Sequence, residues 1–303
     1  MRSHPNLRLV ALALGAITLV AAGCVPPPTP GPPPPPSELL AFPVLEGLDE
    51  PTNVEFAPDG RVFVAEKSGI IRTYDSTADT TPTTAADLTA DVRSVGEHGL
   101  LGMEVDPAYP ARPFVYVMYA WDSTGLWGDG CAAGYGTNGC VTGARIAKLT
   151  IGAGGVAVGA PTTIVDNRWC YQFASHGVGD LEVLDDGSLI ASSGEGAYWV
   201  GADYGQFGGQ QLDPPVAGLT PVNACDDPPN GAGGPVDPTT SEGGSLRAQD
   251  LLTTADPVGW DGAVIRIAPD TGAPMADNPL VGVGPVSDDA VVAHGLRNPY
   301  RLT

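Results

Sequence analysis

Two short segments carry residue types that catalysis needs, and the first is built around His176. It reads Ser-His-Gly-Val-Gly-Asp-Leu over residues 175–181, and a Gly-Glu-Gly turn follows at 194–196. A neutral imidazole with an ordinary pKa of about 6.5 suits a general base near neutral pH. His176 is therefore a candidate base. A buried structural histidine, bonded to a carbonyl oxygen, is the alternative interpretation.

The second segment is Arg297-Asn298-Pro299. Proline disfavours the helical region for the residue before it, so we expect Arg297 and Asn298 to be presented from an extended turn. The planar fork of arginine suits a carboxylate or a developing negative charge on oxygen. A structural clamp on backbone carbonyls would use the same residues.

Two further groups of residues could contribute to a site. The Gly-rich run at 96–102 contains Glu97 and is expected to turn close to the site before Leu100 and Leu101 return to the core. Carboxylates in a later loop could bind Ca²⁺, although their irregular spacing is also typical of solvated loop acids. These carboxylates belong to Asp226, Asp227 and Asp237.

A recurring unit of sequence indicates the elements that position these residues. An Asp-Gly turn precedes a short apolar strand at 57–66 and again at 184–193, and a related hairpin follows at 262–272. Asp-Gly between apolar runs is a strong hairpin signal. A single sheet of such short strands cannot bury its apolar face. Repeating the sheet around an axis lets each sheet bury that face against its neighbour. We therefore predict propeller blades, with long loops at 121–143 and 197–259 roofing a central funnel; a β-sandwich is the alternative.

Composition favours an all-β domain and excludes one class of partner. The 303 residues include 41 Gly and 31 Pro, and only 16% are charged, which is typical of a turn-rich β protein. The 35 acidic residues outnumber the 14 basic ones and give a net charge of −21. This charge repels phosphate backbones, so we expect no nucleic-acid partner.

The N-terminus reads as an export signal. Arg2 and Arg8 precede an apolar run that is too short to span a bilayer comfortably, and the run ends in Val-Ala-Ala-Gly-Cys. We predict a lipoprotein-type signal peptide at 1–23, lipidation of Cys24, a Pro-rich linker at 24–37 and a folded domain at 38–303. Membrane contact would then be only through the lipid anchor; ordinary cleavage and secretion is the alternative.

Four cysteines remain if Cys24 carries lipid, and an even number in an exported protein indicates disulfides. Three pairings are possible. We favour Cys131–Cys140, whose glycine-rich loop can fold back, and consequently Cys170–Cys225. A structural zinc site is not indicated, since no Cys-x-x-Cys or paired histidine spacing occurs.

Taken in order, these motifs resemble the soluble quinoprotein glucose/sorbosone dehydrogenases, which use pyrroloquinoline quinone (PQQ). The resemblance covers 38–303, and its anchors lie at 47–51, 59–66, 96–102, 176–181, 265–269 and 295–299. It implies a six-bladed β-propeller, of which this chain would cover about four blades. It also implies that the chain is incomplete at its C-terminus.

The resemblance implies oxidation of an aldose at its anomeric hydroxyl, with hydride transfer to PQQ and an external electron acceptor. His176 would take the hydroxyl proton, and Arg297 would stabilise charge on the quinone oxygen. Glu97, Arg297 and Asn298 would contact PQQ, and Ca²⁺ ligands would lie beyond Thr303. The family's best sugar oxidisers carry glutamine where Glu97 stands, and an acid there would face an anionic cofactor.

Other functions remain open at this point. A non-catalytic cell-surface propeller could bind carbohydrate or protein, and Glu97 would fit that use. A Ca²⁺-dependent lactonase would need inward acids, for which Glu97, Glu104 and Glu195 are candidates that no spacing pairs. An open propeller leaves an unpaired strand edge, so we expect the 303-residue chain alone to be poorly soluble or inactive.

Overall fold

The computed structural model describes residues 42–121, 142–171, 173–197, 225, 247–248, 258–283 and 288–303. The chain divides at Phe42 into two units, and the first, Met1–Phe42, lies outside this range apart from Phe42. Several sequence predictions therefore lie outside the described residues: the signal peptide, the linker, Cys24, Cys131, Cys140, Asp226, Asp227 and Asp237. No helix among the described residues is long and apolar enough to cross a membrane.

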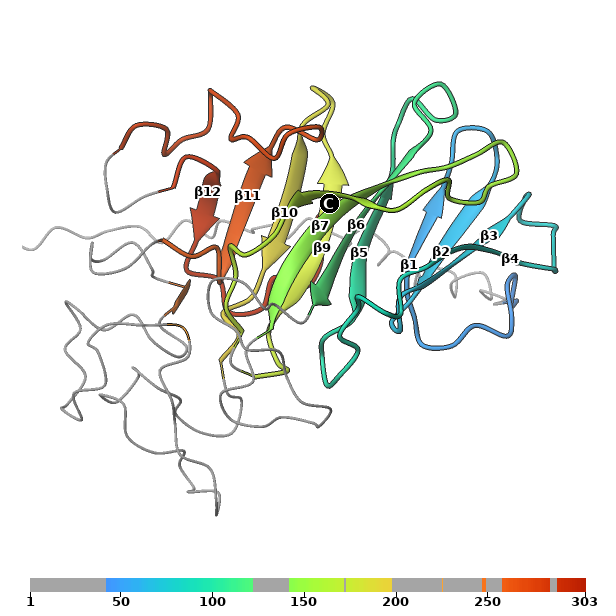
Figure 1. The fold of residues 1–303 in the computed structure, drawn as a ribbon, viewed down its shortest axis with the longest axis horizontal. Coiled ribbons are helices and arrows are strands. Elements are labelled where there is room, and N and C mark those ends of the chain that lie inside the picture. The colour runs from blue at the N-terminus through green and yellow to red at the C-terminus, as the bar shows by residue number, and fades with distance from the viewer. Residues whose placement is uncertain are drawn as a thin grey trace, which may run out of the picture. The chain divides into compact units, whose positions relative to one another are not determined.

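The described residues form three four-stranded antiparallel sheets, each built from strands that are consecutive in sequence (Figure 1). The first sheet contains β1 (Pro51–Phe56), β2 (Val62–Glu66), β3 (Ile70–Tyr74) and β4 (Thr83–Asp87). The second contains β5 (Leu100–Val105), β6 (Phe114–Trp121), β7 (Gly143–Thr150) and β8 (Thr162–Val165). The third contains β9 (Val178–Val183), β10 (Leu189–Ser193), β11 (Ala263–Ile267) and β12 (Val291–His294).

The way these sheets meet is that of propeller blades. Each sheet is a simple up-and-down meander, and its first strand lies against the first strand of the neighbouring sheet: β5 contacts both β1 and β9. A radial stack of four-stranded meanders with their first strands innermost is the β-propeller arrangement. The all-β prediction is confirmed.

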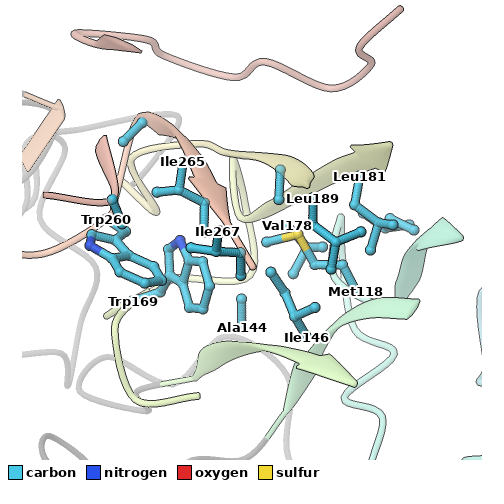
Figure 2. Packing of buried hydrophobic residues seen from close by; sticks show 14 of the residues in the cluster. Met118, Ala144, Ile146, Trp169, Val178, Leu181, Leu189, Trp260, Ile265 and Ile267 are labelled. Atoms are coloured by element: carbon cyan, nitrogen blue, oxygen red, sulfur yellow. The ribbon is translucent and has the colours of Figure 1, made fainter. Parts of the chain in front are cut away.

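Two apolar layers hold the three sheets together. Phe63, Met103 and Tyr119 belong to the layer between the first and second sheets. The layer between the second and third sheets includes Met118 and Leu189, and Figure 2 shows these side chains meeting. At one end of this layer Trp169 and Trp260 pack edge to face, with ring centroids 5.1 Å apart. Such an aromatic pair adds about 0.5–1.5 kcal/mol beyond its buried area.

Two of the recurring sequence units lie in one sheet. The described residues hold three sheets, and the sequence predicted about four blades for the whole chain. Strand β10 pairs with β11, with Leu189 opposite Ile267, so the long insertion between them connects neighbours inside one blade. The length of an insertion does not reveal whether the chain returns to the sheet that it left.

The meander also explains why distant motifs meet. In an antiparallel meander, the connection between the second and third strands leaves the same edge of the sheet as the connection to the next sheet. At this edge lie Lys67 after β2, Glu97 before β5, His176 before β9, Glu195 after β10 and Arg297 after β12. The Asp-Gly turns lie at the opposite edge, since they join the first and second strands.

One glycine permits the closest approach at this edge. The N–H of Gly194 donates to the carbonyl oxygen of Gly177 over 2.7 Å. A Cβ atom at Gly194 would lie 2.1 Å from the carbonyl oxygen of His176 and 2.8 Å from that of Arg297. Three connections can therefore touch only because residue 194 has no side chain.

Acidic side chains gather where the first strands meet. Glu55 on β1 and Glu104 on β5 are hydrogen-bonded to each other, which requires a proton on one of the two carboxyls. Burial, with the charges of Glu182 and Asp180, raises the pKa of Glu55 to about 7. Burial, with the charge of Glu55, raises the pKa of Glu104 to about 8.

These raised pKa values predict that stability falls as pH rises. The folded chain keeps protons that the unfolded chain releases near the ordinary value of 4.5, so the free energy of unfolding should decrease from about pH 4.5 to about pH 8. Glu104→Gln keeps hydrogen-bonding atoms but cannot ionise, and should flatten this decrease. Thermal unfolding followed across pH 5 to 9 measures it, and equal slopes for the two proteins would contradict the assignment.

A second prediction concerns Gly194→Ala. The added methyl group must push the His176 and Arg297 segments apart, and we expect a loss of about 1–3 kcal/mol in the free energy of unfolding. Gly154→Ala is the matched control, because a Cβ there would meet nothing within 4 Å. Denaturant unfolding compares the two, and equal stabilities would show that the close approach is unimportant.

Candidate active site

The backbone of His176 is held in an unusual conformation. The residue lies between β8 and β9, its φ is +46°, and it is 5% exposed. Its N–H donates to Glu97 Oε2 over 2.7 Å, and its carbonyl oxygen accepts the N–H of Gly196 over 2.9 Å. Residues other than glycine rarely adopt positive φ. These two backbone contacts stabilise that conformation, and the conformation sets the position of the imidazole.

The imidazole is oriented by a buried carboxylate. Its Nδ1 lies 2.7 Å from Glu195 Oε1, and both side chains are nearly inaccessible to solvent. Since an ionised carboxylate only accepts, Nδ1 carries the proton and Nε2 keeps its lone pair. Burial lowers the pKa of His176, the charge of Arg297 lowers it further, and the charge of Glu97 opposes them. His176 is thus a neutral imidazole with a defined tautomer near pH 7.

Arg297 completes this group from the third sheet. Its Nε lies 3.8 Å from Glu195 Oε1, and its carbonyl oxygen accepts the N–H of Glu195 over 3.1 Å. The Arg297 side chain is 66% exposed, so most of the guanidinium is available to an anion. Arg247 is buried next to Glu195, and its Nη1 lies 3.4 Å from the Glu195 carbonyl oxygen.

A pocket opens beside these residues. Its volume is about 370 Å³, and its walls combine polar and apolar side chains from all three sheets and from the segment after β12. The residues that line it are Thr52, Lys67, Gly96, Glu97, Leu101, Gly177, Val178, Asn298 and Tyr300. Glu97 and Asn298, both predicted from the sequence, thus share one cavity.

The second histidine at this edge has a structural role. His98 is completely buried; its Nδ1 lies 3.1 Å from Thr142 Oγ1, and its ring packs against Tyr171. Burial, with the charges of Arg93 and Lys67, lowers the pKa of His98 to about 3. A Cβ at Gly177 would lie 2.5 Å from His98 Nε2, so this ring supports the segment that carries His176.

The structure brings together the four residues predicted for catalysis and cofactor contact: His176, Glu97, Arg297 and Asn298. Sequence reasoning missed the role of Glu195, which entered only as a candidate calcium ligand. The Gly-Glu-Gly turn was the available signal, because a carboxylate between two glycines is presented by backbone that can approach closely. Glu104 lies apart, paired with Glu55. No group of three or more His, Cys, Asp or Glu among the described residues is placed to hold a metal ion.

A disulfide anchors the approach to His176. Cys170 and Cys225 are joined, in the predicted pairing, and both are buried. The N–H of Cys170 donates to the carboxylate of Asp261, at 3.0 and 3.2 Å from its two oxygens. The bridge ties residue 225 of the long insertion to the connection that leads into the site.

Comparisons with known proteins agree with the fold. The chain resembles a solved putative oxidoreductase (glucose dehydrogenase) from Thermus thermophilus, at 22% identity and a TM-score of 0.55 over 84% of this chain and 54% of that one. It also resembles the PQQ-bound aldose sugar dehydrogenase from Streptomyces coelicolor, at 20% identity and a TM-score of 0.51 over 84% and 53%. No protein with a curated description matches the sequence.

These likenesses show the fold, and the chain spans about half the length of both solved structures. Its three sheets correspond to about half of a six-bladed propeller. The family model described as Glucose / Sorbosone dehydrogenase matches residues 48–208, which is more than half of the 303 residues. The chain therefore belongs to the glucose/sorbosone dehydrogenase family.

Proposed function

We propose that this protein is an exported PQQ-dependent dehydrogenase that oxidises the anomeric hydroxyl of aldose sugars and passes the electrons to an external acceptor. The observation that carries the proposal is the buried His176–Glu195 pair, 2.7 Å apart, with the exposed guanidinium of Arg297 beside it. Family membership supports the cofactor class.

The residues at the pocket fit the anionic edge of PQQ, which carries three carboxylates. Arg297 offers a largely exposed guanidinium, and Lys67 and Asn298 line the adjoining cavity. Amide and guanidinium donors bind carboxylates well, and guanidinium binds them bidentately. One oxygen of the Glu97 carboxylate accepts a hydrogen bond from the His176 N–H. This bond stabilises part of the negative charge of Glu97 within the protein. When bound, PQQ supplies the two-electron acceptor for a hydride.

His176 is the proposed general base. Its Nδ1–H is held by Glu195, so its Nε2 lone pair is available to accept the proton of the anomeric hydroxyl. The sugar loses that proton from oxygen and a hydride from carbon, and becomes a lactone. Glu195 stabilises the imidazolium that results, and Arg297 supplies positive charge where negative charge develops on oxygen.

Export and anchoring complete the proposal. The basic residues Arg2 and Arg8, the apolar run and Cys24 support a cleaved lipoprotein signal, and the proline linker would hold the domain away from the membrane. Calcium is proposed as a second cofactor, with ligands outside the described residues.

A PQQ titration of the protein encoded by the full-length gene, in the presence of Ca²⁺, tests the function directly. Quinone absorbance should show stoichiometric binding, and adding an aldose should reduce the cofactor and then an artificial dye. Absence of binding at roughly tens of micromolar PQQ would reject the dehydrogenase, because the cofactor would then bind too weakly to be retained. The alternative, a non-catalytic propeller that binds carbohydrate or protein, would then take its place.

Replacing the base tests the mechanism. His176→Ala should lower kcat for dye reduction by about 10²–10⁴, the usual contribution of a general base, while PQQ still binds. His294→Ala is the matched control, since His294 is exposed at the end of β12 and should leave kcat unchanged. Wild-type rates in the His176 variant would remove it from the role of base.

A further inference from the structure

The conformation of His176 needs an explanation beyond the carboxylate that holds its ring. Among the described residues, positive φ outside glycine occurs at Glu50, Asn167 and His176. Asparagine visits this region readily, and Glu50 lies on the exposed surface. His176 adopts it while buried at the candidate site, so neighbouring groups must favour this conformation over the ordinary ones.

Glu97 makes the contact that can do this. Its Oε2 accepts the His176 N–H over 2.7 Å, and the two residues come from different connections, before β5 and before β9. A short bond from a backbone N–H to a carboxylate is among the stronger hydrogen bonds in proteins. It fixes the direction of the His176 N–H, and with it the backbone conformation at that residue.

Glu97 is itself held against the same segment. Its N–H donates to the carbonyl oxygen of Ala174 over 2.9 Å, two residues before His176. Gly96 makes this approach possible, because its φ is +58° and a Cβ there would lie 2.4 Å from the same carbonyl oxygen. Glu97 thus binds the His176 segment at two points, once through its backbone and once through its side chain.

We propose that Glu97 is a positioning residue, which holds the His176 backbone in its left-handed conformation so that the ring meets Glu195. Three charged side chains surround His176, each from a different connection: Glu97, Glu195 and Arg297. Glu97 also counteracts burial and Arg297, which lower the pKa of His176. The expected effect of Glu97 on catalysis rests on the proposed function. Its effect on the conformation of His176 rests on geometry alone.

Two substitutions separate the hydrogen bond from the charge. Glu97→Gln keeps an oxygen that can accept the His176 N–H but removes the negative charge. Glu97→Ala removes both. Glu46→Gln is the control. Glu46 is exposed on the segment before β1, so this substitution makes the same chemical change away from the site.

The structural test uses the full chain without cofactor, with the imidazole of His176 followed by nitrogen NMR as pH varies. Its signal is assigned by its loss in His176→Ala. Glu97→Gln should give one sharp signal that titrates at a lower pH than in the wild-type protein, because a charge that raises the pKa is gone. Glu97→Ala should broaden or split the signal. A sharp wild-type signal in Glu97→Ala would overturn the proposal.

The loaded enzyme supplies a second readout. Glu97→Ala should lower kcat by about tenfold or more through misplacement of the base, and Glu97→Gln, which keeps the acceptor for the His176 N–H, should lower it less. Weaker PQQ binding in both variants with unaltered kcat would make Glu97 a cofactor contact and overturn the positioning role. If wild-type protein binds no PQQ, the dehydrogenase proposal fails, and the NMR test still decides the role of Glu97.

Discussion

The candidate site depends on three backbone hydrogen bonds that join the segments before β9, after β10 and after β12 at one edge of the third sheet. Gly194 donates to Gly177, Gly196 donates to His176, and Glu195 donates to Arg297, at 2.7, 2.9 and 3.1 Å. Together they place the Glu195 carboxylate between His176 and Arg297. The two glycines make these contacts possible, because their lack of a side chain lets three segments of backbone meet. The chemistry of the site is therefore built on main-chain geometry before any side chain is considered.

The blades supply that geometry through their first strands. Strands β1, β5 and β9 pack against one another, and each is preceded by a connection at the edge where the candidate residues lie. This packing brings Glu55 and Glu104 together and keeps a proton between them. The packing of the first strands thus brings acidic side chains close together between the sheets. It also brings the loops that carry the candidate residues together at one edge.

The sequence predicted much of this and missed what depends on long-range pairing. Asp-Gly turns located strands β2 and β10, because a turn's requirements are local. His176, Glu97, Arg297 and Asn298 were predicted from residue type and from resemblance, and the structure places them at one edge. The pairing of β10 with β11 was missed because about seventy residues separate them and nothing local records the return. The partnership of Glu195 with His176 was missed for another reason: it depends on how the segments before β9 and after β10 are brought together at one edge of their sheet.

The two histidines at this edge show why residue type alone cannot assign a base. His98 and His176 both precede the first strand of a sheet, and each is followed by a glycine. His98 faces the interior, where complete burial lowers its pKa to about 3 and leaves Nε2 against Gly177 with no described hydrogen-bond partner. His176 instead has a carboxylate on one ring nitrogen and a cation nearby. The difference arises from the left-handed turn at residue 176, which points its ring toward Glu195.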